Sequence, residues 1–259
     1  MLHDQSGPHL RLFTRTTRSV SPTQAGERLL QALAPRLRGL EEDLDAIRAM
    51  RGTPSGSVRI SLSDHALETV VWPKLRDVLP NHPDIKLELN GDNGFRDIVK
   101  ERFDAGVRLG ESLDRDMIAV RIGPDWRLVA VASPSYLARC GTPRHPRDLQ
   151  EHNCINQRQI RSGNLYAWEF ERGEEELRIR VHGNLIFNTA YAQIDAAAKG
   201  YGTAYLPEST VTDELRDGRL VQVLDEWSPF FPGYHLYYPT RRENSSALSF
   251  VIDALRHPG

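Results

Sequence analysis

Residues 11–30 read RLFTRTTRSVSPTQAGERLL, and this stretch decides how the rest of the chain is organised. Its first half interleaves arginines with threonine, serine and valine, which suits a short hairpin that lays guanidinium and hydroxyl donors along a phosphate backbone. Its second half opens a helix, with Ser21 as the predicted N-cap, Pro22 at the first helical position and Gln24 three residues after the cap. The stretch therefore predicts a basic turn that leads directly into a helix.

The predicted helix carries apolar side chains at alternating steps of three and four residues. This spacing has the period of 3.5 residues with which one helix packs against another. Pro35 lies off the apolar row and predicts a bend rather than an end, because it removes one backbone hydrogen bond. A hinge is expected after Gly52, at Pro54 and Gly56. The residues expected to pair two subunits are Leu30, Leu33, Leu37, Leu40, Leu44 and Ile47.

Charge separates this N-terminal segment from the rest of the chain. Residues 9–38 contain six arginines and one glutamate, a balance of +5 in a chain of net charge −2, so the remainder carries −7. A basic segment on an acidic body is typical of a nucleic-acid-binding edge attached to a domain with another role. The alternative is an ordinary surface helix with a basic start.

Length and composition fit a cytoplasmic protein with two core-bearing units and an arm. The chain has 259 residues, of which 39% are hydrophobic, and no apolar run approaches the ~20 residues of a membrane span. An N-terminal apolar signal segment is missing, which argues against secretion. The two cysteines, Cys140 and Cys154, fall in a segment expected to be a loop and form neither a disulfide framework nor a four-ligand zinc site. We expect no cofactor and no metal ion.

Three stretches resemble the LysR-type transcriptional regulators. Residues 11–30 are similar to the wing and the start of the linker helix of that family. VASPSYLARCGTPRHPRDLQEHNCI (131–155) is similar to the crossover into the second half of its effector domain, and AAAKGYGTAYLPESTVTDELRDGRLVQVL (196–224) to the C-terminal part of that half. The similarity covers almost all of the chain. It implies a DNA-binding regulator that binds a small-molecule effector. It also implies that the regulator forms a homodimer or homotetramer.

The resemblance also implies an α/β fold with a two-lobed effector domain like that of periplasmic binding proteins, each lobe a Rossmann-like subdomain. The parts expected are a remnant of the winged helix-turn-helix, with its wing, at 1–20, a linker and dimerisation helix at 21–52, and the effector-binding domain at 53–259. Within that domain, the first lobe is expected at about 57–131 plus 230–259, and the second at about 132–229.

The wing is expected to contact DNA through Arg11, Arg15, Thr16 and Arg18. Only MLHDQSGPHL (1–10) precedes it, so the recognition helix that reads base edges in this family is expected to be absent. Wing arginines supply phosphate contacts, which position a protein without selecting a sequence. Weak, sequence-indifferent DNA binding is therefore expected of this polypeptide alone.

After the hinge, strand and helix patterns alternate with short connections, which predicts a mostly parallel sheet with helices on its faces. By resemblance, the last elements pack on the first lobe, so two connections cross between the lobes. Strands are expected at 58–62, 85–89, 105–109, 118–122, 127–131, 177–181, 184–187, 204–206, 220–224 and 234–238. Helical segments are expected at 67–79, 95–103, 136–140, 189–199, 208–215 and 246–255.

The candidate effector residues follow from the position of ligands in open α/β sheets, which bind in a cleft outside the carboxyl ends of strands. Hydroxyls, free helix amides and one guanidinium at these positions favour a small carboxylate-bearing metabolite. The candidates are Ser63, Asp64 and His65 after the first strand, Arg108 and Gly110 at the end of the third, Ser133 at the entrance to the second lobe, and Asn188 and Thr189 at the start of helix 189–199.

Simpler roles remain open for several of these residues. Asp64 and Asn188 fit helix N-caps equally well. Arg108 fits an ion pair with a carboxylate of its own lobe. The aromatic residues that fit either the wall of a pocket or the core are Trp126, Tyr166 and Trp168.

An enzyme is the main competing class. The chain has no G-x-S-x-G, P-loop or G-x-G-x-x-G motif, and the consecutive Ser63, Asp64 and His65 cannot form a relay. A stand-alone module that binds small molecules without DNA is the other alternative; the heptad helix and the missing secretion signal count against its periplasmic form. We therefore expect a regulator in which the effector favours one hinge angle and subunit pairing transmits it to the wings.

Overall fold

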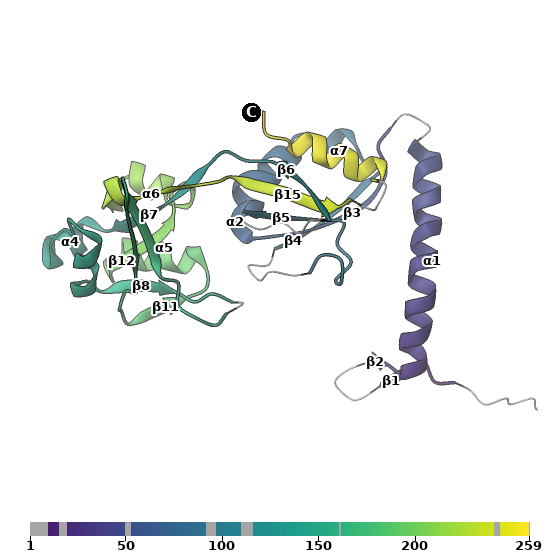
Figure 1. Ribbon diagram of the computed structural model, residues 1–259, viewed down its shortest axis with the longest axis horizontal. Helices are drawn as coiled ribbons and strands as arrows, with labels where there is room; N and C mark the ends of the chain where they lie inside the picture. Colours follow the sequence, from purple (N-terminus) through teal and green to yellow (C-terminus); the bar gives the residue numbers. More distant parts are fainter. Residues whose placement is uncertain are drawn as a thin grey trace, which may run out of the picture.

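The structure is a computed structural model that describes residues 10–15, 20–49, 53–91, 97–109, 116–160, 162–240 and 244–258. Within these ranges the side chains of residues 15, 35, 38, 41–43 and 45–49 fall outside the description. Figure 1 shows a long helix with a hairpin at its start, a first lobe beside this helix and a second lobe farther from it. The predicted α/β fold with two lobes is confirmed.

The N-terminal arm consists of a short hairpin and one long helix. Strands β1 (Phe13–Arg15) and β2 (Val20–Pro22) pair antiparallel. Helix α1 (Gln24–Ala49) has 26 residues and continues without a break through Pro35. Figure 1 shows it standing beside α7, with the hairpin at the far end.

The first turn of α1 is capped two residues later than the sequence predicts. The hydroxyl of Thr23 accepts a hydrogen bond from the backbone N–H of Gly26 at 3.2 Å, as an N-cap side chain does. Ser21, the predicted cap, lies in β2 instead. The hairpin is the reason, because the backbone N–H of Thr23 donates to the carbonyl of Leu12 at 2.9 Å and keeps the chain extended up to that point. Gly26 is needed here, since a Cβ would lie 2.1 Å from the Leu12 carbonyl oxygen.

The first lobe is built on a five-stranded sheet with the order β4-β3-β5-β15-β6. Strands β3 (Gly56–Leu62), β4 (Ile85–Gly91) and β5 (Ala105–Leu109) are parallel. Strand β15 (Tyr234–Pro239) runs antiparallel between β5 and β6 (Met117–Arg121). Because β15 comes from the C-terminal end of the chain, the polypeptide returns to this lobe after building the second one (Figure 1).

One face of this sheet is covered by α7 and by a helix that changes its winding. The sequence predicts a regular helix over 67–79, but its first part is π-helical, with the N–H of Trp72 donating to the carbonyl of Leu67 five residues back. Pro73 has no N–H to continue the regular pattern, which accounts for the wider turn before it. The elements are α2 (Asp64–Ala66), η1 (Leu67–Val71), α3 (Trp72–Leu75), η2 (Leu79–Asn81) and α7 (Ser246–Leu255).

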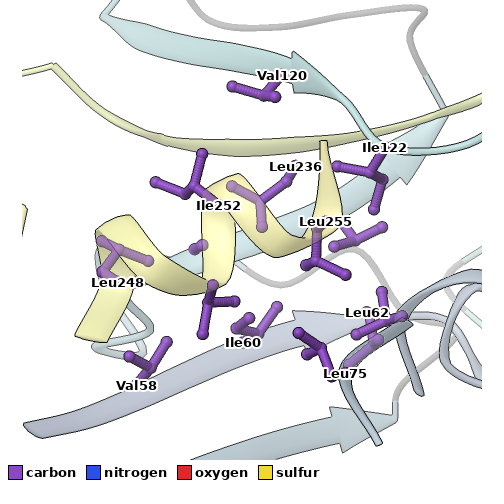
Figure 2. Close-up of a cluster of buried hydrophobic side chains, with 14 of the residues drawn as sticks. Val58, Ile60, Leu62, Leu75, Val120, Ile122, Leu236, Leu248, Ile252 and Leu255 are labelled. Carbon is purple, nitrogen blue, oxygen red and sulfur yellow. The ribbon is translucent and has the colours of Figure 1, made fainter. Parts of the chain in front are cut away.

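The core of the first lobe lies between the sheet and α7. Val58, Ile60 and Leu62 alternate along β3 and are at most 2% exposed. Burying one such side chain contributes about 1.5–3 kcal/mol, so this row fixes the direction of β3 and the position of the residues that follow it. Figure 2 shows the row facing α7, whose side chains in the cluster include Leu248, Ile252 and Leu255.

The second lobe is built on a mixed sheet with the order β11-β8-β12-β7-β13, and β14 also pairs with β7. Strands β8, β11 and β12 are parallel to one another, whereas β7 runs antiparallel to each of its partners. The strands are β7 (Trp126–Ala132), β8 (Cys154–Gln157), β11 (Leu185–Phe187), β12 (Thr203–Pro207), β13 (Val221–Val223) and β14 (Phe230–Phe231).

Both faces of this sheet are covered. Helix α5 (Ala190–Ala198) packs on one face, and the hairpin of β9 (Trp168–Arg172) and β10 (Glu175–Ile179) packs on the other. The remaining helical segments are α4 (Pro134–Cys140), η3 (Pro146–Glu151), η4 (Glu208–Thr210), α6 (Thr212–Arg216) and η5 (Asp225–Trp227).

The connections between the lobes lie at residues 122–125 and 232–233. The sequence places the first lobe up to residue 131 and again from residue 230, and both boundaries differ from the structure. β7 pairs with β12, and β14 pairs with β7, so both strands belong to the second sheet. The sequence of an apolar strand fits either sheet, and only its pairing partners decide to which lobe it belongs.

Two further predictions of local structure are wrong. Residues 98–102 form turns where the sequence predicts a helix over 95–103; residues 92–96 lie outside the described part. Cys154, expected in a loop, lies in β8 and is fully buried. The alternation of Trp168, Phe170 and Arg172 in β9 was also missed, although it is the pattern of a half-buried strand.

Candidate functional site

Residues that follow strand ends in the two lobes meet at the junction of the lobes. In the first lobe β3 leads into Ser63 and α2, and in the second lobe β12 leads into η4. The side chain of His65 on α2 reaches the side chain of Ser209 on η4, with 2.8 Å between Nε2 and Oγ. The junction is therefore the place where the rule for open α/β sheets puts a ligand.

Ser63 caps α2 and has a second contact. Its Oγ accepts a hydrogen bond from the backbone N–H of Ala66 at 3.2 Å. Its hydroxyl also donates to the hydroxyl of Tyr234, 3.5 Å away on β15. Asp64 is the first residue of the helix, so it is not the N-cap that the sequence left open as an alternative.

His65 lies between two hydroxyl groups from different elements. Its Nδ1 is 2.8 Å from the hydroxyl oxygen of Tyr234, and its Nε2 is 2.8 Å from that of Ser209. A neutral imidazole has one nitrogen that donates and one that accepts, so it satisfies both contacts at once. Trp126 packs beside the imidazole with 5.3 Å between ring centroids.

This group of side chains is uncharged near neutral pH. Burial lowers the pKa of His65 to about 4, well below its ordinary value of 6.5, because the imidazolium ion loses hydration. Burial raises the pKa of the Tyr234 hydroxyl, and the hydrogen bond from Ser63 opposes that rise. The junction thus offers donors and acceptors from His65, Ser209 and Tyr234 rather than a positive charge.

The aromatic residues take different roles. Trp126 lies at the junction, stacked on Tyr234 with 6.2 Å between centroids and 10° between planes, and its indole N–H is buried without a hydrogen-bond partner. Trp168 is 1% exposed and belongs to the core of the second lobe. Tyr166 packs against that same core, and its hydroxyl donates to Glu169 at 3.0 Å. Of the three aromatic candidates, Trp126 alone remains a candidate for the wall of a ligand site.

Thr189 and Asn188 follow β11, at the same end of the sheet as η4. Thr189 occupies the N-cap position of α5 but makes no side-chain capping bond, and Asn188 precedes the cap. Both are exposed. Gln193, one turn into α5, is 1% exposed; its Nε2 donates to the Thr189 carbonyl at 3.4 Å, and its Oε1 has no partner. The start of α5 therefore keeps polar groups that its own side-chain cap does not satisfy.

Arg108 ends β5 near the level of Ser63, because Ser61 on β3 pairs with Gly106 on β5. Its guanidinium packs over the ring of Tyr237 at 5.2 Å from the centroid. Tyr237 belongs to a small cluster with Ile98 and Phe103, separate from the core beneath α7. Gly110 lies outside the described residues.

Ser133 is the candidate that the structure does not bring to the junction. It follows β7, which runs antiparallel to β12, so it lies at the end of the sheet where β12 begins. There it is 2% exposed, caps α4 by accepting from the N–H of Tyr136, and lies close to Gly200. In the mostly parallel sheet that the sequence predicts, the residue after this strand would lie with the other carboxyl ends, but the antiparallel direction of β7 puts Ser133 at the opposite end.

Two residues at the junction were missed. Ser209 follows β12 in the segment LPES, and the rule about strand carboxyl ends would have found it. Tyr234 begins β15, and no local pattern distinguishes it from the other aromatic residues of that strand. Only the tertiary fold brings Tyr234 to Ser63 and His65.

The apolar row of α1 faces outward. Leu30, Leu33 and Leu37 are 49%, 41% and 60% exposed, and Leu40 and Leu44 are 57% and 44% exposed. The side chain of Ile47 lies outside the description, as do those of Arg15, Thr16 and Arg18 in the hairpin. Arg11 is exposed, and its carbonyl accepts a hydrogen bond from the hydroxyl of Thr23 at 2.6 Å.

Comparison with known proteins gives a consistent result. The profile described as the LysR substrate binding domain matches residues 51–258. Over 248 residues the chain is 54% identical to a transcriptional regulator of Pseudomonas aeruginosa, and the match covers 96% of this chain and 81% of that protein. The HTH-type transcriptional regulator PgrR of Escherichia coli is 46% identical over 250 residues, which are 96% of this chain and 84% of that one.

The similarity extends to solved structures. The full-length structure of AphB, a Vibrio cholerae virulence activator and member of the LTTR protein family, superposes with a TM-score of 0.73 at 26% identity. That superposition covers 95% of this chain and 83% of AphB. Within the described part of this chain, no helix is at once long and apolar enough to cross a membrane.

Proposed function

Because the chain belongs to the LysR family of transcriptional regulators, which are not enzymes, we propose that its two lobes bind a small effector molecule at their junction and that α1 pairs two subunits. The family membership follows from a match over residues 51–258 and from relatives of 54% and 46% identity. The meeting of polar groups from both lobes at Ser209 and His65 is the observation that carries the effector proposal.

The chemistry of the junction favours a small anion held by neutral donors. The hydroxyl of Ser209 and the indole N–H of Trp126, which is buried without a protein partner, are donors that carry no charge. The first turn of α5, which follows Thr189 and has no side-chain cap, adds backbone amides and the positive end of the helix dipole. Carboxylate oxygens accept hydrogen bonds from all of these groups.

The effector proposal is tested by thermal-shift and calorimetric titration against amino acids, dicarboxylates and aromatic acids. Replacing Asn188 and Thr189 by Ala should weaken binding of a compound that stabilises the protein, by about fivefold for each hydrogen bond lost. Ser133→Ala is the matched control, because that serine lies at the opposite end of the sheet. Unchanged affinity in Thr189→Ala and Asn188→Ala would show that neither of these side chains contacts the ligand.

Subunit pairing is supported by the exposure of the apolar row on α1. Its leucines are 41–60% exposed, which leaves several apolar side chains in water along one helix. A heptad row packs such side chains against a second copy of itself. Burying the exposed half of a leucine contributes roughly 1 kcal/mol, so two leucines on each of two helices contribute roughly 4 kcal/mol.

Analytical ultracentrifugation of the full chain tests the pairing. Leu37→Gln with Leu40→Gln should weaken the dimer about a thousandfold, the equivalent of those 4 kcal/mol. Arg28→Gln with Arg36→Gln changes the same number of positions on α1 and leaves the leucine row intact. Equal association of both double variants would show that the row does not hold the subunits together.

The basic hairpin contributes phosphate contacts in this proposal. Arg11 is exposed beside β1, and such contacts position DNA without selecting its sequence. Gel-shift titration of the 259-residue chain should therefore give weak binding that falls steeply with salt and is indifferent to sequence. The alternative is a module that binds small molecules and pairs without DNA, and complete absence of binding at low salt would favour it.

A further inference from the structure

The two lobes are joined by a side-chain hydrogen bond that lies apart from their backbone connections. His65 and Ser209 are 144 positions apart in the sequence. His65 lies on α2 in the first lobe, and Ser209 lies on η4 in the second. Their 2.8 Å contact joins these two elements directly. Neither residue is part of residues 122–125 or 232–233, where the chain itself crosses.

The backbone crossings alone form a narrow hinge. The N–H of Ile122 donates to the carbonyl of Tyr234 at 2.8 Å, and the N–H of Gly233 donates to the carboxylate of Asp125 at 3.0 Å. The two segments approach so closely that a Cβ on Gly233 would lie 2.3 Å from the carbonyl oxygen of Gly123. Two adjacent segments act as one axis, so a contact away from the axis is needed to fix the angle between the lobes.

In the first lobe, the His65 side chain is held in place by hydrogen bonds with other residues of that lobe. Ser63 donates to Tyr234, the hydroxyl of Tyr234 lies 2.8 Å from Nδ1 of His65, and Nε2 of His65 lies 2.8 Å from the hydroxyl of Ser209. In either neutral tautomer one imidazole nitrogen donates and the other accepts, so both contacts are satisfied. Tyr234 is 6% exposed, and it holds the imidazole from the side of the first lobe.

The half in the second lobe is positioned by a charged pair. Glu208, the residue before Ser209, accepts hydrogen bonds from Nε and an Nη atom of Arg127 at 2.9 and 2.6 Å. This two-point contact fixes the start of η4 against β7. Ser209 itself is exposed, so water can replace its bond to His65 when the lobes separate.

We propose that the hydrogen bond between His65 and Ser209 is a clasp that holds the lobes at one hinge angle. It is reversible, because both partners are neutral and one of them is open to solvent. A molecule that enters the junction then either keeps the clasp and stabilises this angle, or takes its place on His65 and releases the lobes. The clasp itself needs no ligand, so its test stands apart from that of the proposed effector site.

Hydrogen–deuterium exchange of the full chain without ligand tests the clasp. Ser209→Ala removes the hydroxyl, and the residue is exposed, so the fold is retained. Exchange in residues 63–71, which lie in the other lobe, should become roughly fivefold faster, the effect of one lost hydrogen bond on an opening equilibrium. Ser209→Thr keeps a hydroxyl and should leave the exchange as it is.

Thr212→Ala is the matched control in the same segment. Its hydroxyl donates to the backbone carbonyls of Glu208 at 3.2 Å and Ser209 at 3.4 Å, both within the second lobe, and the variant keeps the Ser209 hydroxyl, so residues 63–71 should exchange as in the unchanged protein. Nuclear magnetic resonance gives a second readout, since Ser209→Ala should raise the pKa of His65 from about 4 toward 6.5 as water reaches the imidazole. Unchanged exchange and titration in Ser209→Ala, or equally fast exchange in Thr212→Ala, would overturn the clasp.

Discussion

Acidification should destabilise this protein through one histidine. In the folded chain burial lowers the pKa of His65 to about 4, against 6.5 for an imidazole in water. The unfolded chain therefore binds a proton at this position about 300 times more tightly than the folded chain. Since protons favour the unfolded state, stability from this residue is complete above pH 6.5 and is lost as the pH falls toward 4.

The size of the effect follows from the same two values. At pH 5 the unfolded imidazole is almost fully protonated, whereas the folded one remains mostly neutral. The linkage relation then gives a loss of about 2 kcal/mol in the free energy of unfolding between pH 7.5 and pH 5, and about 3 kcal/mol below pH 4. A few kilocalories are a large share of the stability of an ordinary domain.

Urea denaturation at a series of pH values measures this loss, with His65→Gln as the comparison. Gln keeps an amide that donates and accepts hydrogen bonds but does not titrate, so the variant should be less sensitive to pH by about 2 kcal/mol over this interval. His182→Gln is the control, because His182 is exposed to water in the folded chain. If His65→Gln and the unchanged protein lose stability in parallel, the imidazole is not buried between the lobes and the account of the junction is wrong.

Three further outcomes follow from other parts of the fold. Gly233→Ala should destabilise the protein by about 1–3 kcal/mol in thermal unfolding, because its Cβ would meet the carbonyl oxygen of Gly123 at 2.3 Å; an unchanged Tm would show that the crossings are looser than described. Cys140 is exposed and should react with a thiol reagent at pH 8 in the folded protein. Cys154 is buried, and burial raises its pKa to about 12, so it should react only after unfolding. Fast reaction of both thiols would contradict the place of Cys154 in β8. Ser245→Ala should cost about 1 kcal/mol, measured by urea denaturation, because its hydroxyl caps α7 by accepting from a backbone N–H at 3.2 Å.

The sequence predicts most of the first lobe because its strands carry regular patterns. Val58, Ile60 and Leu62 alternate with polar residues, and Ile85 to Leu89 do the same, which is enough to identify two strands and their buried faces. The boundary between the lobes is not predictable in this way. Residues 128–131 are apolar on both faces, as a central strand often is, and their pairing with β12 depends on residues 73–79 positions later.

Candidate residues lie at the junction where the direction of the preceding strand could be inferred from the sequence, and away from it where that direction could not be inferred. Ser63 and His65 follow a strand that is parallel to its neighbours, and they lie at the junction. Ser133 follows an antiparallel strand, and it lies at the opposite end of its sheet. A single sequence shows that a segment is a strand, but the direction of that strand is set by partners that the local pattern does not reveal.

The electrostatics of the junction bear on how a ligand would set the hinge angle that we propose. Arg127 is paired with Glu208 and Asp225 within the second lobe, at 2.6 and 2.9 Å, so the carboxylate of the residue before Ser209 already has a counter-ion there. The groups that come together when the lobes close are the neutral His65 and a hydroxyl. Forming this contact therefore takes no unpaired charge out of water. Moving an unpaired charge out of water would cost several kcal/mol. With that cost absent, we expect the open and closed arrangements to differ by only a few kcal/mol, so an effector that forms two or three hydrogen bonds in one arrangement alone is sufficient to select it.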